Sequence, residues 1–188
     1  TVRGYQCAES TAADGLTADF VYVENALPVD LLNVKGKIVL VNGFLRVPLY
    51  RSLMEAGAAA VVTMDGDIHD DLENTDLHQR KLRSALRTFG NAPAVQLRTV
   101  DAMEIVNKGA SRAKVTVQNK NITLTSHNVI AEIKGTEHPE QIISFGAHYD
   151  SVEFSKGVYD NGAGSVINME AARWFAQHPP KRTVKFCW

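Results

Sequence analysis

The chain has 188 residues, of which 45% are hydrophobic and 22% are charged, values typical of a soluble globular protein and not of a disordered tail. Its formal net charge of −1 excludes a global field that recruits nucleic acid or an anionic membrane surface. The longest apolar stretch, residues 56–64, is far shorter than the roughly 20 residues that a membrane-spanning helix needs. Cys7 and Cys187 form no CxxC pair, so neither a structural zinc site nor a redox motif is predicted.

The first half of the chain predicts strands alternating with helices. Residues 37–43 are a continuous aliphatic run that ends at an Asn-Gly turn pair, which is typical of a buried parallel strand. Pro48 can occupy the first turn of a helix that ends near Gly57. Residues 58–64 predict a second buried strand. Together these segments predict a βαβ unit with a right-handed crossover.

Two charged segments follow this unit. The acidic stretch 65–76 lacks the glycine at position six and the glutamate at position twelve of a calcium-binding EF-hand loop, so we expect a solvated surface loop. The basic segment 80–87 has Leu82 and Leu86 at helical spacing, which predicts a short amphipathic helix and not a nucleic-acid patch. Further along the chain, the pattern predicts a strand at 94–97, a helix at 101–108 and a strand at 113–118.

A polar segment at 120–127 predicts a domain boundary. Beyond it, residues 128–134 and 141–145 predict two strands joined by a hairpin-like connection. A helix from about Gly162 to Gln177 and a strand over 183–188 complete the predicted elements. The predicted fold class is therefore α/β on both sides of the boundary.

Three side chains that follow the predicted strand at 141–145 could form a metal site. His148 and Asp150 are two residues apart at its end, so period-two alternation puts both on one side, where Asp150 can accept a hydrogen bond from the His148 ring. Such a carboxylate strengthens the other ring nitrogen as a metal ligand. Asp160 lies just before the predicted helix, where a carboxylate can bridge two cations, although it could instead cap that helix. All three residues follow the carboxyl end of a strand, where open α/β sheets place ligands.

Other catalytic interpretations of this region fail. Ser165 lacks the G-x-S-x-G elbow of a serine hydrolase. Ser151 comes three residues after His148, and strand residues at that spacing point to opposite faces. The glycines at 157, 162 and 164 match neither a phosphate-binding loop nor a dinucleotide fingerprint.

The segments His148-Tyr-Asp-Ser151 and Asp160-Asn-Gly-Ala-Gly164 together resemble the opening of the M28 family of zinc peptidases, which includes aminopeptidases and glutamate carboxypeptidase-like enzymes. The preceding region resembles the protease-associated (PA) domain that many members carry, best at residues 34–43, 56–62 and 92–95. The resemblance implies a PA domain over 1–120, with a β-rich α/β sandwich fold. It implies that 121–188 are the N-terminal fragment of a three-layer α/β/α zinc-exopeptidase domain.

By the same resemblance, His148 binds one zinc ion, Asp160 bridges two, and Asp150 is the catalytic-site residue that orients His148. The implied reaction is hydrolysis of peptide bonds by metal-activated water, on a peptide substrate. The motif favours an aminopeptidase over a carboxypeptidase. Relatives tend to be secreted or to face outward, which is a tendency of the family only.

The family's paired glutamates and its later aspartate and histidine ligands do not occur before Trp188. We therefore expect this chain to be a fragment that is inactive by itself and holds zinc weakly. We also expect the apolar faces of 128–188 to favour a homo-oligomer or a domain swap. The alternative is a binding or receptor module with a lapsed peptidase domain, and the retention of His148, Asp150 and Asp160 argues against it.

Overall fold

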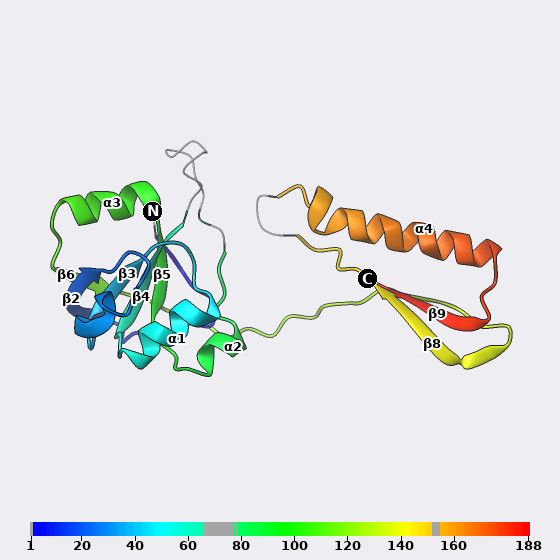
Figure 1. Cartoon of the computed structure of the whole chain (residues 1–188), viewed down its shortest axis with the longest axis horizontal. Coiled ribbons are helices and arrows are strands. Elements are labelled where there is room, and N and C mark those ends of the chain that lie inside the picture. Colours follow the sequence, from blue (N-terminus) through cyan, green and yellow to red (C-terminus); the bar gives the residue numbers. More distant parts are fainter. Residues whose placement is uncertain (1, 66–76, 78, 152–154) are drawn as a thin grey trace. The chain divides into compact units, whose positions relative to one another are not determined.

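The computed structural model describes residues 2–65, 77, 79–151 and 155–188. The chain forms two compact units, residues 1–121 (unit 1) and residues 122–188 (unit 2), which are seen in Figure 1. Both units combine helices with a sheet, which confirms the predicted α/β class. The side chains of the predicted acidic loop at 65–76 lie outside the described residues.

Unit 1 is built on a six-stranded sheet with the order β1-β5-β4-β3-β2-β6. The four central strands are parallel, and β1 and β6 add antiparallel edges. The strands are β1 (Val2–Gly4), β2 (Leu16–Tyr22), β3 (Ile38–Val41), β4 (Ala60–Asp65), β5 (Ala94–Arg98) and β6 (Arg112–Val115). The helices are η1 (Asp30–Asn33), α1 (Val47–Glu55), α2 (Ser84–Arg87) and α3 (Thr99–Asn107).

The predicted βαβ unit is confirmed as β3, α1 and β4. Strand β3 pairs in parallel with β4, and Ile38 lies opposite Ala60. Pro48 lies in the first turn of α1, where an N–H has no acceptor within the helix, so proline loses no hydrogen bond there. Gly57 ends the helix with a φ of 79°, a left-handed conformation that favours glycine.

Alternate residues of β3 face two separate hydrophobic cores. Val39 and Val41 belong to the core that includes Leu53 of α1. Ile38 and Leu40 belong to the core that includes Ala102 of α3. Because the strand is buried on both faces, it has a continuous aliphatic sequence instead of an alternating one.

The predicted helix over residues 80–87 is wrong for its first half. Helix α2 covers only Ser84–Arg87. Before it, the main-chain N–H of Leu82 donates to the carbonyl of Gln6 at 2.8 Å, and the N–H of Gln6 donates to the carbonyl of Arg80 at 2.8 Å. This pairing with a segment near the N-terminus holds residues 80–82 extended, while the side chain of Leu82 is fully buried.

Unit 2 contains a three-stranded sheet with the order β7-β9-β8. Its strands are β7 (Ile130–Ile133), β8 (His138–Gly146) and β9 (Arg182–Cys187). The predicted hairpin is wrong, because β9 lies between the other two strands, antiparallel to β7 and parallel to β8. Val184 and Phe186 of β9 are buried, which explains why this late strand takes the centre of the sheet.

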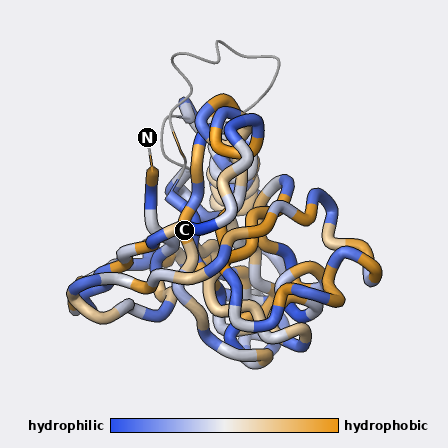
Figure 2. The backbone as a smooth tube through the Cα atoms, turned by 90° about the vertical axis from the view of Figure 1, so that its left-hand side faces the viewer, coloured by the Kyte–Doolittle hydropathy of each residue, from blue (hydrophilic) through white to orange (hydrophobic). Residues whose placement is uncertain are grey.

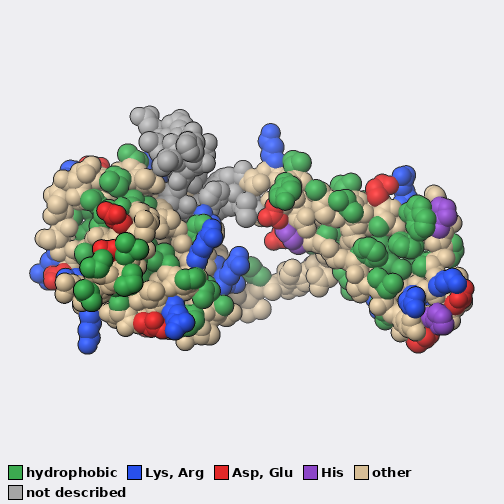
Figure 3. Space-filling model, in the orientation of Figure 1, with side chains coloured by type: hydrophobic (Ala, Val, Ile, Leu, Met, Phe, Trp, Pro, Cys, Tyr) green, Lys and Arg blue, Asp and Glu red, His purple; other side chains and the backbone are tan. Residues whose placement is uncertain are grey.

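Helix α4 (Gly164–Gln177) lies along one face of this sheet (Figure 1). Phe175 of α4 packs against Phe145 and Phe186, with ring centroids 6.2 and 6.3 Å away. Many other hydrophobic side chains of unit 2 remain exposed, and they appear as the green areas over its visible face in Figure 3. The most exposed on α4 and β8 include Ile142, Ile143, Val166, Ile167, Met169 and Trp174.

Short hydrophobic runs are interrupted by hydrophilic residues along the backbone tube of Figure 2. Within the described ranges, none of the helices has both the length and the apolar character needed to cross a membrane.

Candidate metal centre

The candidate ligands lie at the carboxyl edge of the small sheet. Strand β8 ends at Gly146, so His148 and Asp150 lie in the loop just beyond it and not on the strand itself. The parallel strand β9 ends beside β8, with Gly146 paired to Cys187. Asp160 lies in a short turn, η2 (Val158–Ala163), that precedes α4 and has non-helical backbone angles at this residue. The site therefore forms where loops follow strand ends, as in open α/β sheets generally.

The structure brings the three predicted side chains together around one imidazole ring. Nδ1 of His148 lies 3.0 Å from Oδ1 of Asp150 and 3.0 Å from the main-chain oxygen of the same residue. Nε2 of His148 lies 3.0 Å from Oδ1 of Asp160. Each ring nitrogen thus faces a carboxylate, and the exposed fractions of the three side chains are 54% for His148, 86% for Asp150 and 68% for Asp160.

These neighbours favour the charged form of the ring. Hydrogen bonding to the main-chain oxygen of Asp150 raises the pKa of His148 above its ordinary value, and the Asp150 carboxylate acts in the same direction. The negative charge of Asp160 adds to this effect. The same acidic surroundings are suited to attract a cation.

The donor atoms of this group fit a zinc ion. Imidazole nitrogen and carboxylate oxygen are both ordinary zinc ligands. Nδ1 of His148 is hydrogen-bonded to Asp150, so Nε2 is the ring nitrogen that faces Asp160. His148 and Asp160 therefore present one nitrogen and one oxygen donor towards each other. Within the described part of the chain, no cluster of three or more His, Cys, Asp or Glu side chains is arranged to hold a metal. His148 and Asp160 together supply two candidate donor atoms.

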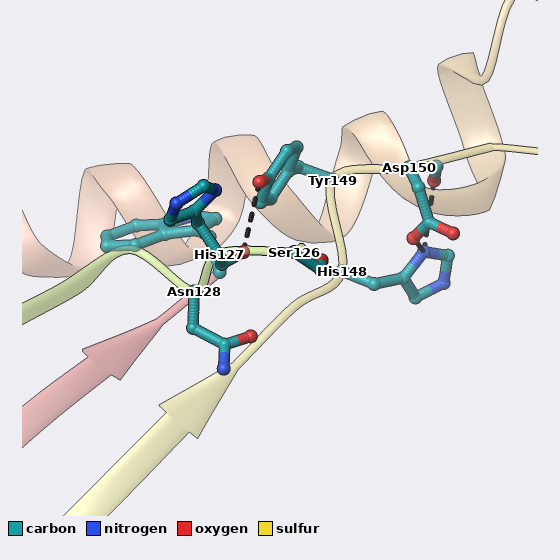
Figure 4. A pocket seen from close by; sticks show the side chains of 7 residues that line it. Ser126, His127, Asn128, His148, Tyr149 and Asp150 are labelled. Atoms are coloured by element: carbon teal, nitrogen blue, oxygen red, sulfur yellow. Dashed lines mark hydrogen bonds and ion pairs between the residues drawn. The ribbon is translucent and has the colours of Figure 1, made fainter. Parts of the chain in front are cut away.

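A pocket of about 330 Å³ opens beside the histidine within unit 2 (Figure 4). In Figure 4 the Asp150 carboxylate lies against the His148 ring, while the Tyr149 hydroxyl points to the main chain of His127 and donates to its carbonyl at 3.2 Å. The residues that line the pocket are Ser126, His127, Asn128, His148, Tyr149, Asp150 and Trp188.

The sequence analysis did not single out residues 126–128 as part of this region. Ser126 and His127 belong to the polar segment that was interpreted only as a domain boundary, and Asn128 begins the strand predicted over 128–134. They carry no sequence motif of their own. They lie near the site because they directly precede β7.

The fold is α/β, and its candidate ligands lie together at a sheet edge. Residues 128–188 match the model of peptidase family M28.

The chain is also similar to a probable leucine aminopeptidase 2 of Aspergillus fumigatus, with 27% identity over 88% of this chain and 32% of that protein. Leucine aminopeptidase 2 of Arthroderma otae is 29% identical over 95% of this chain and 36% of that protein. The solved structure of BSAP, a zinc aminopeptidase from Bacillus subtilis, matches with a TM-score of 0.72 and 24% identity, over 99% of this chain and 44% of that chain. The chain thus spans about a third of the length of these two fungal proteins.

Proposed function

We propose that unit 2 carries part of the two-zinc centre of an aminopeptidase. The observation that supports this most directly is the 3.0 Å separation of His148 Nε2 and Asp160 Oδ1, within a segment that matches the model of peptidase family M28. The names of the similar fungal proteins, leucine aminopeptidase 2, favour an aminopeptidase over a carboxypeptidase and a peptide as the substrate.

In this proposal His148 would help to hold one zinc ion, and Asp160 would contribute to holding both. Bound zinc supplies a Lewis acid for the peptide carbonyl and makes hydroxide available near neutral pH. Asp150 does not bind the metal. It accepts a hydrogen bond from Nδ1 of His148, fixes the ring tautomer and keeps Nε2 directed at Asp160.

We further propose that unit 1 is a PA domain that carries no zinc ligand. Its six-stranded sheet is covered by α1 and α2 on one face and by α3 on the other, which supports a self-contained domain with two cores of its own.

For the 188-residue chain by itself we propose weak zinc binding and no peptidase activity. The support is that two side chains converge on the site, whereas closed zinc sites use four. Titration of zinc into this chain, followed by isothermal calorimetry, tests the proposal. Tight binding of two ions would overturn it.

The function itself is tested on the intact protein with leucyl and glutamyl substrates, with and without a chelator. We expect the intact protein to hydrolyse the leucyl substrate and the chelator to abolish this activity. His148→Ala and Asp160→Asn should each reduce the rate by at least about 100-fold. Glu170→Gln, on the exposed face of α4, is the control and should leave the rate unchanged. Binding of zinc without any hydrolysis would favour a non-catalytic module, and hydrolysis that resists the chelator would exclude the metal mechanism.

A further inference from the structure

Two serine hydroxyls link the segments that carry the candidate ligands. Ser165, in the first turn of α4 and downstream of Asp160, donates to the main-chain oxygen of His148 at 3.1 Å. Ser151, which directly follows Asp150, donates to the main-chain oxygen of Asp160 at 2.8 Å. Each hydroxyl therefore reaches from the segment of one candidate ligand to the backbone of the other.

The turn that carries Asp160 is fitted closely against Ser151. Gly157 has a φ of 65°, and a Cβ added there would lie 2.9 Å from Cβ of Ser151, which is too close for any side chain. The N–H of Gly162 donates to the carbonyl of Gly157 at 2.7 Å and closes the turn around Asp160. The Ser151 hydroxyl therefore donates its hydrogen bond to a closely packed turn whose backbone conformation depends on Gly157.

The second serine lies on an anchored helix end. The carbonyl of Ser165 accepts the indole N–H of Trp188 at 3.3 Å. Nearly one turn later, the side-chain amide of the buried Asn168 donates to the carbonyl of Cys187 at 3.2 Å. These contacts tie the start of α4 to the end of β9, so the Ser165 hydroxyl holds the His148 backbone from a fixed element.

We propose that Ser151 and Ser165 are positioning residues that hold His148 and Asp160 at the separation needed to bind metal. This inference rests on the proposed function of the site. Neither hydroxyl contacts the His148 ring or the Asp160 carboxylate in the contacts above. Each acts on the backbone that carries a ligand, as outer partners of metal sites do when they fix ligand orientation.

The test is binding of Co²⁺ to the intact protein, followed through the visible absorption of the bound ion. We expect Ser151→Ala and Ser165→Ala each to weaken Co²⁺ binding about 10-fold and to alter the absorption band. Ser151→Thr and Ser165→Thr retain the hydroxyl and should restore affinity and spectrum. Ser144→Ala, at an exposed serine of β8, is the matched control and should change neither. Thermal unfolding of the metal-free variants shows whether each remains folded.

Unchanged affinity and spectrum in folded Ala variants would overturn the positioning role, as would Thr variants as defective as the Ala variants. His148→Ala separates this inference from the proposed function. If that variant binds Co²⁺ as well as the wild type, the proposed metal centre fails and the serine inference fails with it. If His148→Ala loses Co²⁺ while the serine variants keep it, only the serine inference is wrong.

Discussion

His148 Nε2 and Asp160 Oδ1 face each other at 3.0 Å, although one follows β8 and the other precedes α4. The two donor atoms converge because the chain returns through η2 to the sheet edge that it left after β8. Holding a shared cation at this place would therefore need little movement of either segment, which reduces the cost of ordering the site on binding.

Loss of the Asp150 carboxylate should weaken metal binding without removing a ligand. We expect Asp150→Ala to lower the zinc affinity of the intact protein by about 10- to 100-fold, because the His148 ring loses the partner of its Nδ1 atom. Isothermal calorimetry measures the change. Glu140→Ala is a matched control, since Glu140 also follows a histidine by two residues and lies 3.9 Å from His138. Equal zinc affinities in the wild type and Asp150→Ala would rule out the orienting role.

Acid should destabilise unit 1 through the ion pair of Arg98 and Asp101. The guanidinium of Arg98, 2.8 Å from the carboxylate, lowers the pKa of Asp101 from 3.8 to about 2. Because the folded pKa is depressed, the pair stabilises the fold above the ordinary pKa, and this contribution is lost as the pH falls from 3.8 towards about 2.

We therefore expect the difference in unfolding temperature between wild type and Asp101→Asn to be largest above about pH 5 and to vanish near pH 2. Circular dichroism melts across this range measure it. Glu55→Gln is the control, because the ion pair of Glu55 with Arg51 is exposed on the surface of α1 and such pairs contribute little. A difference that grows as the pH falls would contradict the assignment.

Two leucines of unit 1 should differ sharply in their contribution to stability. Leu53 of α1 is fully buried, whereas 76% of Leu32 is exposed. We expect Leu53→Ala to lower the free energy of unfolding by about 2–5 kcal/mol, since it leaves a cavity beside β3. Leu32→Ala should change that free energy by less than about 0.5 kcal/mol. Urea unfolding of the two variants compares them directly, and similar losses in both would show that the core is misassigned.

The sequence predicted best the features that depend on neighbouring residues. The aliphatic runs around Gly57 predicted β3, α1 and β4, because a strand buried on two faces leaves an uninterrupted hydrophobic pattern. The motif from His148 to Gly164 likewise indicated which polar side chains lie close together in the structure. In both cases the information lies within a short stretch of chain.

The features that the sequence missed depend on partners far along the chain. Strand β9 enters between β7 and β8 and buries Phe186, which no pattern within 128–145 can show. Residues 80–82 are extended because they pair with Gln6, whose sequence carries no strand signal. The pocket residue His127 lies in a polar stretch without periodicity, so only the fold places it near His148.

Because unit 2 has an exposed hydrophobic surface, its backbone amides should be less protected against hydrogen exchange than those of unit 1. Strand β8 is at an edge of its sheet and is exposed along its length, whereas β3 is central and fully buried. The hydrogen bonds of an exposed edge strand can open without disrupting a hydrophobic core. We therefore expect the amide protons of β8 to exchange faster than those of β3 in the monomer. We also expect this difference to shrink as the concentration rises, because a free edge with nearby hydrophobic side chains favours self-association. Hydrogen exchange by mass spectrometry, with sedimentation to establish the oligomeric state, measures both effects. Equal protection of β8 and β3 in a verified monomer would show that unit 2 is stable without further cover.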